Sequence, residues 1–426
     1  MISEKIPVKS SDASPRIIAF YLTQFHPTAE NDRWWGKGFT EWTNVTKSLP
    51  LFHGHYQPHL PADLGFYDLR VKETRHEQII YAKNHGIDGF CYHYYWFSGT
   101  RILNAPLDAM FSDPESDMPF CLCWANENWT RRWDAAENEV LIAQKYLPDD
   151  DLNFIKSLIP FFEDGRYIKV DGKPFLIVYR PQHLPDSKKS ISIWREYCLS
   201  IGLGEIFVCA ALTHGNEDYV EYGFDAGVEF PPHNLKIANI NGEIPFHEKF
   251  YGNVMDYAQI AGSFLNKKYK QTAVFKTVFP SWDNAARTKE RSLIVLNGNP
   301  ENYEYWLSST LDLCKEGKCP DQLVFINAWN EWAEGCHLEP DRRYGDRFLQ
   351  ATLNAKNGVR RFSDFQSKGI PEEVWKHRRK LIPDLLELFS HHAVSCFESV
   401  QASIIRRPWL HRILLPFVRL VRKLKN

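Results

Sequence analysis

An apolar run leads directly into two glutamates in the stretch Leu323-Val324-Phe325-Ile326-Asn327-Ala328-Trp329-Asn330-Glu331-Trp332-Ala333-Glu334-Gly335. Its first part, Leu323 to Asn327, is short and rich in β-branched and aromatic residues, which is typical of a buried strand. Its second part is polar and ends in glycine, as expected of a loop. The pattern therefore predicts a strand that carries Glu331 and Glu334 at its carboxyl end.

Glu331 and Glu334 are three residues apart. If the chain turns after Trp329, their Cβ atoms come to about 5–6 Å from one another. Retaining glycosidases work with two carboxyl groups about 5–5.5 Å apart, and an apolar surround raises the pKa of the less solvated one. The alternative interpretation is a surface loop with two solvated glutamates. The buried strand, Trp329 and Trp332 favour a catalytic pair, with Glu334 as acid/base and Glu331 as its partner.

Seven further apolar runs of strand length precede this one, at residues 16–22, 89–97, 119–124, 175–179, 206–212, 226–230 and 272–279. Helical patterns separate several of them, at 73–85, 151–162 and 191–201, and Gly86 suits the position just after the first of these helices. Unbroken apolar strands that alternate with helices indicate a parallel sheet covered on both faces. Eight such strands predict the α/β class and a closed (β/α)₈ TIM barrel with long aromatic-rich loops.

In such barrels the functional groups lie at the carboxyl ends of the strands. Polar and aromatic side chains gather at these ends, and a long loop after the first strand is also dense in rings. The predicted substrate-binding residues are His26, Trp42, His93, Tyr94, Trp96, Trp124, Asn126, Glu127, Glu229, Trp282, Asp283, Trp329, Asn330 and Trp332. For Asp283 the alternative is a cap of the helix that follows.

The composition excludes some classes of partner. A formal net charge of −2 produces no overall positive field that would attract nucleic acid, so nucleic acid is not expected as a partner. Aromatic residues make up 14% of the chain, with 14 Trp, and favour a sugar-binding surface. The nine cysteines form no C-x-x-C pair, and Cys91, Cys121, Cys123 and Cys209 fall in strand-like runs as small hydrophobes. This usage predicts a reducing cytoplasm.

No cofactor and no metal are predicted. The histidines form no H-E-x-x-H or other compact ligand set, and no Gly-rich phosphate loop is present. Arg131 and Arg132 suit either a phosphate or sugar acid, or an ion pair with Asp134 or Glu137. The chain has no apolar signal segment and no run of about 18 apolar residues, so it is expected to be soluble or attached at a membrane surface.

Four segments are predicted: an N-terminal tail at 1–15, the barrel at 16–357, a charged helical extension at 358–403 and a basic amphipathic helix at 404–426. The last segment holds seven Lys or Arg and no acid beside an apolar stripe from Leu410 to Leu424. Such a helix can bind the anionic inner leaflet of the cytoplasmic membrane. The alternative is that the stripe packs on the rest of the protein, since Pro416 interrupts the segment.

Several motifs resemble the WbsX group of glycosyltransferases, which is related to glycoside hydrolase family 99, the endo-α-mannosidases. They are Tyr21-Leu22-Thr23-Gln24-Phe25-His26-Pro27, Gly38-Phe39-Thr40-Glu41-Trp42, Tyr92-His93-Tyr94-Tyr95-Trp96, Cys123-Trp124-Ala125-Asn126-Glu127-Asn128-Trp129 and Trp329-Asn330-Glu331-Trp332-Ala333-Glu334-Gly335. The resemblance implies a role in bacterial surface polysaccharide, O-antigen or capsule.

The same resemblance implies roles for the two glutamates. Glu331 corresponds to the carboxylate that deprotonates a sugar 2-hydroxyl on the way to an anhydro-sugar, and Glu334 corresponds to the acid/base. Ala333 stands where the hydrolases carry a histidine. The expected function is an enzyme acting on glycosidic bonds of an oligosaccharide or polysaccharide, as a retaining hydrolase or transglycosylase. The alternatives are a glycosyltransferase with an activated sugar donor and a non-catalytic glycan-binding barrel.

Overall fold

Eight parallel strands close into a barrel in the computed structural model, which describes residues 14–131 and 136–374. They are β1 (Arg16–Tyr21), β2 (Gly89–Phe97), β4 (Phe120–Trp124), β8 (Lys173–Val178), β9 (Phe207–Leu212), β10 (Ala226–Glu229), β12 (Val274–Val278) and β15 (Leu323–Ile326). Each pairs with the next, and β1 closes the ring by pairing with both β2 and β15. The predicted (β/α)₈ barrel of the α/β class is confirmed.

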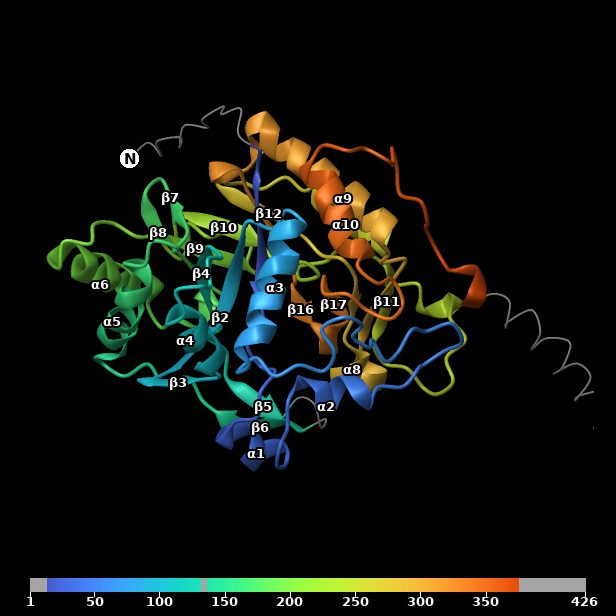
Figure 1. Ribbon diagram of the computed structural model, residues 1–426, viewed down its shortest axis with the longest axis horizontal. Coiled ribbons are helices and arrows are strands. Elements are labelled where there is room, and N and C mark those ends of the chain that lie inside the picture. The colour runs from blue at the N-terminus through green and yellow to red at the C-terminus, as the bar shows by residue number, and fades with distance from the viewer. Residues whose placement is uncertain (1–13, 132–135, 375–426) are drawn as a thin grey trace, which may run out of the picture. The chain divides into compact units, whose positions relative to one another are not determined.

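Helices surround this barrel and follow the strands along the chain (Figure 1). The longer ones are α3 (Lys72–Asn84), α5 (Asp150–Phe162), α6 (Ser187–Ser200), α7 (Tyr257–Leu265), α9 (Pro300–Leu313) and α10 (Arg347–Lys356), and the shorter ones are α1 (Ala29–Trp35), α2 (Glu41–Thr46), α4 (Ala105–Phe111) and α8 (Ala285–Thr288). Helix α5 lies beside α6, and α9 lies beside α10. The three predicted helices correspond to α3, α5 and α6.

The strands form where the sequence is apolar because both of their faces are buried. Ile17, Phe90, Phe120 and Phe325 are fully excluded from solvent, as expected for parallel strands covered on both sides. Helix α3 ends as predicted, since Gly86 follows it with a φ of +80°, a conformation that favours glycine.

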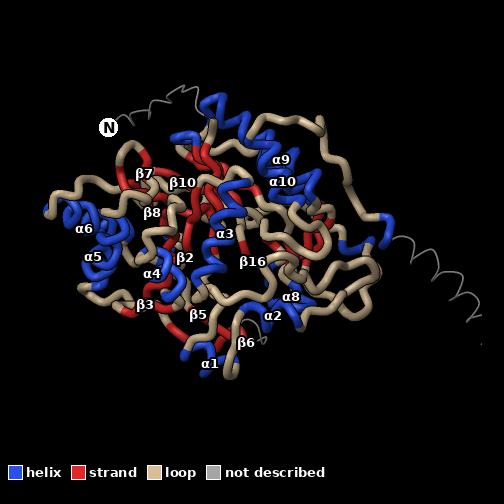
Figure 2. The backbone as a smooth tube through the Cα atoms, in the orientation of Figure 1, coloured by secondary structure: helices blue, strands red, loops and turns tan. Residues whose placement is uncertain are grey.

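Further short strands belong to the loops that connect barrel elements (Figure 2). They are β3 (Thr100–Ile102), β5 (Trp129–Arg131), β6 (Ala136–Ile142), β7 (Lys169–Val170), β11 (Asn253–Asp256), β13 (Trp282–Asp283), β14 (Leu293–Leu296), β16 (Asn330–Glu331) and β17 (Cys336–His337). Strands β11, β14 and β13 form a small sheet, and β16 pairs with β17 in an antiparallel hairpin. The hairpin follows β15 directly and carries the two glutamates.

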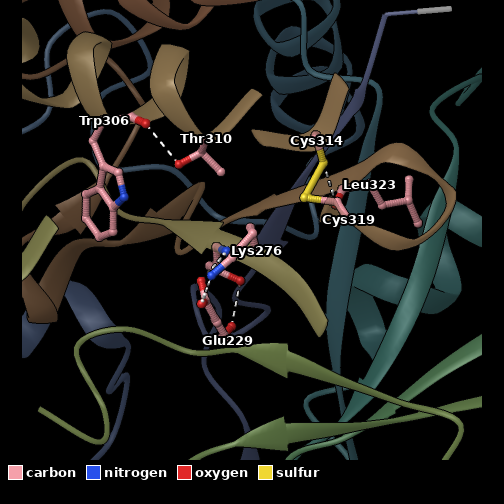
Figure 3. The surroundings of a disulfide bond; sticks show 8 residues. Glu229, Lys276, Trp306, Thr310, Cys314, Cys319 and Leu323 are labelled. Carbon is pink, nitrogen blue, oxygen red and sulfur yellow. Dashed lines mark hydrogen bonds and ion pairs between the residues drawn. A yellow bond between two sulfur atoms is a disulfide. The ribbon is translucent and has the colours of Figure 1, made fainter. Parts of the chain in front are cut away.

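A disulfide joins Cys314 and Cys319 just before β15 (Figure 3). No sequence pattern predicts this bond, because these cysteines lack the C-x-x-C spacing and their proximity depends on the turn after α9. The cysteines of the barrel strands are free and buried, including Cys91 and Cys209. Their burial agrees with the predicted role as small hydrophobes, although Cys123 also contacts His93.

The chain divides into two compact units, residues 1–371 and 372–426. Helix α10 ends at Lys356, next to the predicted boundary at 357. The predicted tail at 1–15 and extension at 358–403 lie largely outside the described residues, and the predicted basic helix at 404–426 lies wholly outside them. Among the described residues, no helix combines the length and apolar character needed to cross a membrane.

Candidate active site

A tight turn holds the two glutamates at the carboxyl end of β15. Glu331 ends β16, a 3₁₀ turn over Trp332–Glu334 follows, and β17 returns the chain so that Glu331 pairs with Cys336. Gly335 closes the turn with a φ of +56°. A Cβ atom there would lie 3.0 Å from backbone atoms of Asp283. Glycine is therefore required both by the left-handed backbone and by the close approach of the neighbouring loop.

Both glutamates converge on one guanidinium. Arg287, on the short helix α8, donates from Nη1 to Glu334 Oε1 at 2.6 Å and from Nη2 to Glu331 Oε2 at 2.9 Å. Its Nη2 also lies 3.1 Å from Oε2 of Glu41, whose side chain is fully buried at the start of α2. One cation thus faces three carboxyl groups, and the two glutamates of the hairpin point to the same place.

Burial of the Glu334 carboxyl favours a proton on it. Burial raises the pKa of Glu334 to about 7, with Arg287 opposing this rise and the charges of Glu331 and Glu41 adding to it. Burial likewise raises the pKa of Glu41. Since a general acid/base is most effective when its pKa lies near the working pH, Glu334 is suited to give and take a proton at neutral pH.

A cavity of about 370 Å³ opens beside these carboxyl groups. Its lining combines rings with polar groups from the carboxyl ends of the strands and the loops that follow them: Leu22, Gln24, Trp35, His93, Tyr95, Ala125, Glu127, Asn128, Trp129, Leu141, Tyr179, His214, Phe230, His233, Trp282, Asn284, Arg287, Thr288, Asn327, Glu331 and Glu334. A ring-lined cavity with a few convergent polar groups is the usual form of a small-molecule site.

Some buried polar atoms of this lining have no hydrogen-bond partner within the described part of the chain. They are Nε2 of Gln24, Nδ1 of His93 and Nε1 of Trp282. A buried polar group that makes no hydrogen bond costs about 1–3 kcal/mol. All three residues line the cavity.

The carboxylates also influence the groups on β2. Burial disfavours the charged form of His93, but its contact with Cys123 and the charges of Glu331 and Glu334 outweigh this, so the pKa of His93 is raised. Burial and the charge of Glu331 raise the pKa of Tyr95 well above its usual range. Tyr95 therefore remains a neutral hydroxyl that can donate a hydrogen bond in the cavity.

Of the predicted site residues, the structure brings Glu331, Glu334, His93, Glu127 and Trp282 together around the cavity. The Glu127 carboxylate forms an ion pair with the guanidinium of a neighbouring arginine, Arg180. These residues come from four strand ends that are far apart in the sequence.

Three predicted residues instead face α5 on the outside of the barrel. Tyr94 shares a hydrogen bond with a serine of α5 at 2.8 Å, Trp96 donates to an aspartate of α5 at 2.9 Å, and the ring of Trp124 stacks on a phenylalanine of α5 at 4.1 Å. For the two residues on β2, this outward orientation follows from the alternation of side chains along a strand. Because His93 and Tyr95 line the cavity, Tyr94 and Trp96 point away from it.

Glu229 and Asp283 are held by protein partners. Glu229 accepts from Nζ of Lys276 at 2.6 Å (Figure 3). Asp283 Oδ2 lies 2.6 Å from His55 Nε2 and accepts from Gln57 at 2.7 Å. Its Oδ1 accepts from the backbone N–H of Ala285 in α8 at 3.0 Å, so its contacts resemble the helix-capping alternative.

Two asparagines of the predicted substrate-binding set, Asn126 and Asn330, instead connect the backbones of neighbouring strand ends. Asn126 Oδ1 accepts from the N–H of Arg180 at 2.7 Å, and its Nδ2 donates to the same residue's carbonyl at 2.8 Å. Asn330 makes the equivalent pair with Leu22 at 2.8 and 3.0 Å. Each amide mimics a backbone group and extends the hydrogen bonding of the barrel beyond its last strand pair.

The four remaining predicted residues are buried around the hairpin and the first loop: His26, Trp42, Trp329 and Trp332. Trp332 stacks on His337 with ring centroids 3.7 Å apart, and the ring of Trp42 packs against Trp332 at 5.5 Å. His26 Nδ1 lies 3.0 Å from the backbone carbonyl of Thr23. The rings of Trp42 and His337 therefore pack around Trp332 in the hairpin that carries the glutamates.

Sequence reasoning missed the most highly charged contact of the site. Arg287 is a single arginine in a short polar segment, and nothing in its spacing indicates that it meets Glu41 from 246 positions away. Tyr95 had a usable signal, because it lies two residues after His93 and strand alternation places both on one face. Tyr179 and His233 also line the cavity; burial lowers the pKa of His233 to about 3 and keeps its imidazole neutral.

A closed (β/α)₈ barrel with carboxyl groups and rings at the carboxyl ends of its strands has the architecture typical of barrel enzymes. The family described as Glycosyltransferase WbsX matches residues 17–352. The chain therefore belongs to the WbsX glycosyltransferase family, a family of carbohydrate-active enzymes.

The uncharacterized protein WxcX of Xanthomonas campestris pv. campestris is 42% identical over 341 residues, in each of two strains. The matched segment is 80% of this chain and 49% of WxcX, so the chain spans about half the length of these relatives.

Solved structures share the fold. A glycoside hydrolase-like protein superposes with a TM-score of 0.50 at 15% identity and covers 83% of this chain and 97% of its own. The family 99 endo-α-mannosidase of Bacteroides thetaiotaomicron superposes with a TM-score of 0.50 at 12% identity and covers 81% and 97%. At these identities the likeness concerns the barrel alone.

Proposed function

We propose that this barrel acts on glycosidic bonds of an oligosaccharide or polysaccharide as a retaining hydrolase or transglycosylase, with Glu334 as acid/base and Glu331 as its carboxylate partner. The observation that carries the proposal is the pair itself. Glu334 has a pKa of about 7 and shares one guanidinium with Glu331 beside a cavity lined with rings. A non-catalytic glycan-binding barrel has no need of two buried carboxyl groups, one of which has a pKa close to neutral pH.

The proposed reaction has two steps. Glu331 takes the proton of the sugar 2-hydroxyl, whose oxygen attacks the anomeric carbon while Glu334 protonates the leaving glycosidic oxygen. The resulting anhydro-sugar is opened by water or by an acceptor hydroxyl, from which the ionised Glu334 takes the proton. As the bond between the 2-oxygen and the anomeric carbon breaks, the 2-oxygen recovers its proton from Glu331. Two displacements retain the configuration at the anomeric carbon.

The second candidate is a glycosyltransferase that uses an activated sugar donor, which the description of the family favours. The charges near the cavity favour the first candidate. Arg180 is paired with Glu127, and Arg287 is paired with Glu41, Glu331 and Glu334, so both cations already face carboxylates. A donor diphosphate would add further negative charge to this surround.

The setting we propose is the metabolism of bacterial surface polysaccharide, O-antigen or capsule, in the cytoplasm, with the segment 404–426 at the inner leaflet of the membrane. The support is the family and the residue-by-residue match of Glu331 and Glu334 to the pattern described above. Substrate binding would use His93, Glu127 and Trp282 from the predicted set, together with Tyr95.

The test is to incubate the purified protein with the lipid-linked or released polysaccharide of its source and to follow masses, with and without nucleotide sugars. Shortened chains without nucleotide sugar support a hydrolase, and chains that lengthen only with nucleotide sugar support the transferase. Glu334→Gln is expected to lower the rate by about 10²–10⁴, because the amide cannot move a proton to the leaving oxygen. Glu163→Gln, at an exposed position, is the control.

Glu331→Gln is expected to be equally damaging, since its carboxylate activates a substrate hydroxyl. A substrate that lacks the 2-hydroxyl should then fail with the unmodified enzyme. Cleavage of this deoxy substrate at an unchanged rate would exclude the anhydro-sugar route, and Glu334→Gln activity within threefold of the parent would refute the acid/base assignment.

A further inference from the structure

We propose that His59, His337 and Asp341 form a binding site for a divalent transition-metal ion of the zinc type. One ligand atom from each residue lies within 4.8 Å of the other two, and all three residues are buried. The sequence predicted no metal because the ligands come from two distant segments of the chain. Two imidazoles and a carboxylate are ligands that zinc commonly takes in proteins.

The distances suit a tetrahedral ion. With bonds of about 2.0–2.1 Å, neighbouring ligand atoms of tetrahedral zinc are about 3.3–3.4 Å apart. His59 Nδ1 lies 3.1 Å from His337 Nε2, and the latter lies 3.8 Å from Asp341 Oδ2. These two separations lie on either side of the required distance, and the ligand atoms of His59 and Asp341 lie within 4.8 Å of one another, so a local adjustment of the three side chains would let them bind one ion. A water would complete the coordination.

Two of the three ligand residues are oriented by further hydrogen bonds. His337 Nδ1 lies 3.1 Å from the backbone carbonyl of Glu339, and donation to it places the lone pair on Nε2. Asp341 Oδ1 accepts from the backbone N–H groups of Arg343 and Tyr344 at 2.9 and 2.5 Å, and Oδ2 is the oxygen that faces His337. Such outer hydrogen bonds are the usual means by which proteins orient metal ligands.

The two segments are also held together by their backbones. The N–H of Ala62 donates to the carbonyl of Pro340 at 2.9 Å, and the N–H of Arg342 donates to the carbonyl of Leu60 at 3.0 Å. These bonds pair Pro61, two residues after His59, with Asp341 in a position set by the fold. Little conformational freedom remains to be lost when an ion binds.

The site lies directly behind the candidate active site. His337 pairs with Asn330 in the hairpin, and its ring stacks on Trp332, which stands between the two glutamates in the sequence. A bound ion would fasten this hairpin to the loop that carries His59. Its role is to position Glu331 and Glu334, and it takes no part in the reaction itself.

Another cluster offers a comparison. His76, Asp113 and Glu115 also lie within ligand distance of one another, but Glu115 is exposed. His76 and Lys72 both form ion pairs with Asp113, which occupies its oxygens. This cluster is an ordinary surface network, so His76→Ala serves as a control for adventitious binding.

The experiment measures metal in the full-length protein. Chains purified with Zn²⁺ and dialysed against metal-free buffer are expected to keep about one ion per chain by mass spectrometry, and Zn²⁺ is expected to raise Tm by about 4 °C at 100 times its Kd. Co²⁺ should give the visible absorption of tetrahedral cobalt. In Asp341→Asn, the amide oxygen can still accept from Arg343 and Tyr344, so the fold is preserved while zinc affinity falls at least tenfold.

His337→Ala should lose the ion completely, whereas His76→Ala should bind as the parent does. The proposal is overturned if the parent retains less than a tenth of an ion per chain. It is equally overturned if Asp341→Asn binds zinc as tightly as the parent, or if His76→Ala is the variant that loses the ion. These outcomes are independent of any glycosidic activity and therefore of the proposed function.

Discussion

Replacing Glu334 by glutamine should make the protein more stable in alkaline solution. The pKa of Glu334 is about 7 in the folded chain against 4.5 for an ordinary glutamate. Because the folded value is the higher one, the parent is most stable below about pH 4.5 and loses stability as the pH rises through 7. Glutamine carries no charge at any of these pH values, so the variant does not undergo this loss.

The magnitude follows from the two pKa values. Each pKa unit corresponds to about 1.4 kcal/mol, so the complete loss is about 3 kcal/mol, of which about 2.5 kcal/mol falls between pH 5 and pH 8. The Glu334 side chain is 23% exposed. Screening by solvent reduces the expected difference to about 2 kcal/mol.

The assay is urea unfolding followed by tryptophan fluorescence at pH 5 and pH 8, for the parent, Glu334→Gln and Glu163→Gln. The free energy of unfolding of Glu334→Gln relative to the parent should rise by about 2 kcal/mol between the two pH values. Glu163→Gln, at an exposed helix end, should show no such change. An advantage of Glu334→Gln that is equal at both pH values within about 0.5 kcal/mol would refute the pKa argument and, with it, the protonated acid at neutral pH.

Further changes test other parts of the structure. Arg287→Met should lower the free energy of unfolding by about 3–5 kcal/mol at pH 8, because it leaves buried carboxylates without their cation. The loss should be smaller at pH 5, where Glu334 is protonated. An equal loss at both pH values in urea unfolding would contradict this expectation. Gly335→Ala should cost more than Gly65→Ala. Both positions have a positive φ, +56° and +59°, and both should lose about 1 kcal/mol from the left-handed backbone, but of the two only the Cβ at 335 would lie within 4 Å of other atoms, at 3.0 Å. Thermal unfolding that ranks the two variants equally would contradict the close approach. Full-length protein should sediment with anionic vesicles at low salt, and it should no longer do so at high salt or after truncation at Ser403. If the full-length protein does not bind these vesicles at low salt, the segment 404–426 packs within the protein.

Much of the architecture could be predicted from the order of residues alone. Parallel strands buried on both faces must be apolar throughout. The runs that contain Phe90, Phe120 and Phe325 can therefore be recognised as strands from the sequence, without knowing which strands they pair with. The glutamates at 331 and 334 were equally visible, because a polar loop after an apolar strand marks the carboxyl end of a barrel strand.

Which side chains meet in the cavity was decided by the tertiary structure. Alternation along β2 separates His93 and Tyr95 from Tyr94 and Trp96, but only closure of the barrel determines which pair faces inward. Residue type alone therefore predicts that Trp96 binds substrate, whereas in the structure its indole N–H donates to Asp150 of α5.

The charges of the site depend on contacts that no local pattern encodes. Arg287 meets Glu41 across 246 positions, and His59 meets His337 across 278. A sequence specifies neighbours along a strand or a helix turn through their periodicity, and thereby determined the barrel and the place of the two glutamates. The pKa of Glu334 depends on burial and on charges brought from distant loops, and these exist only once the barrel has closed.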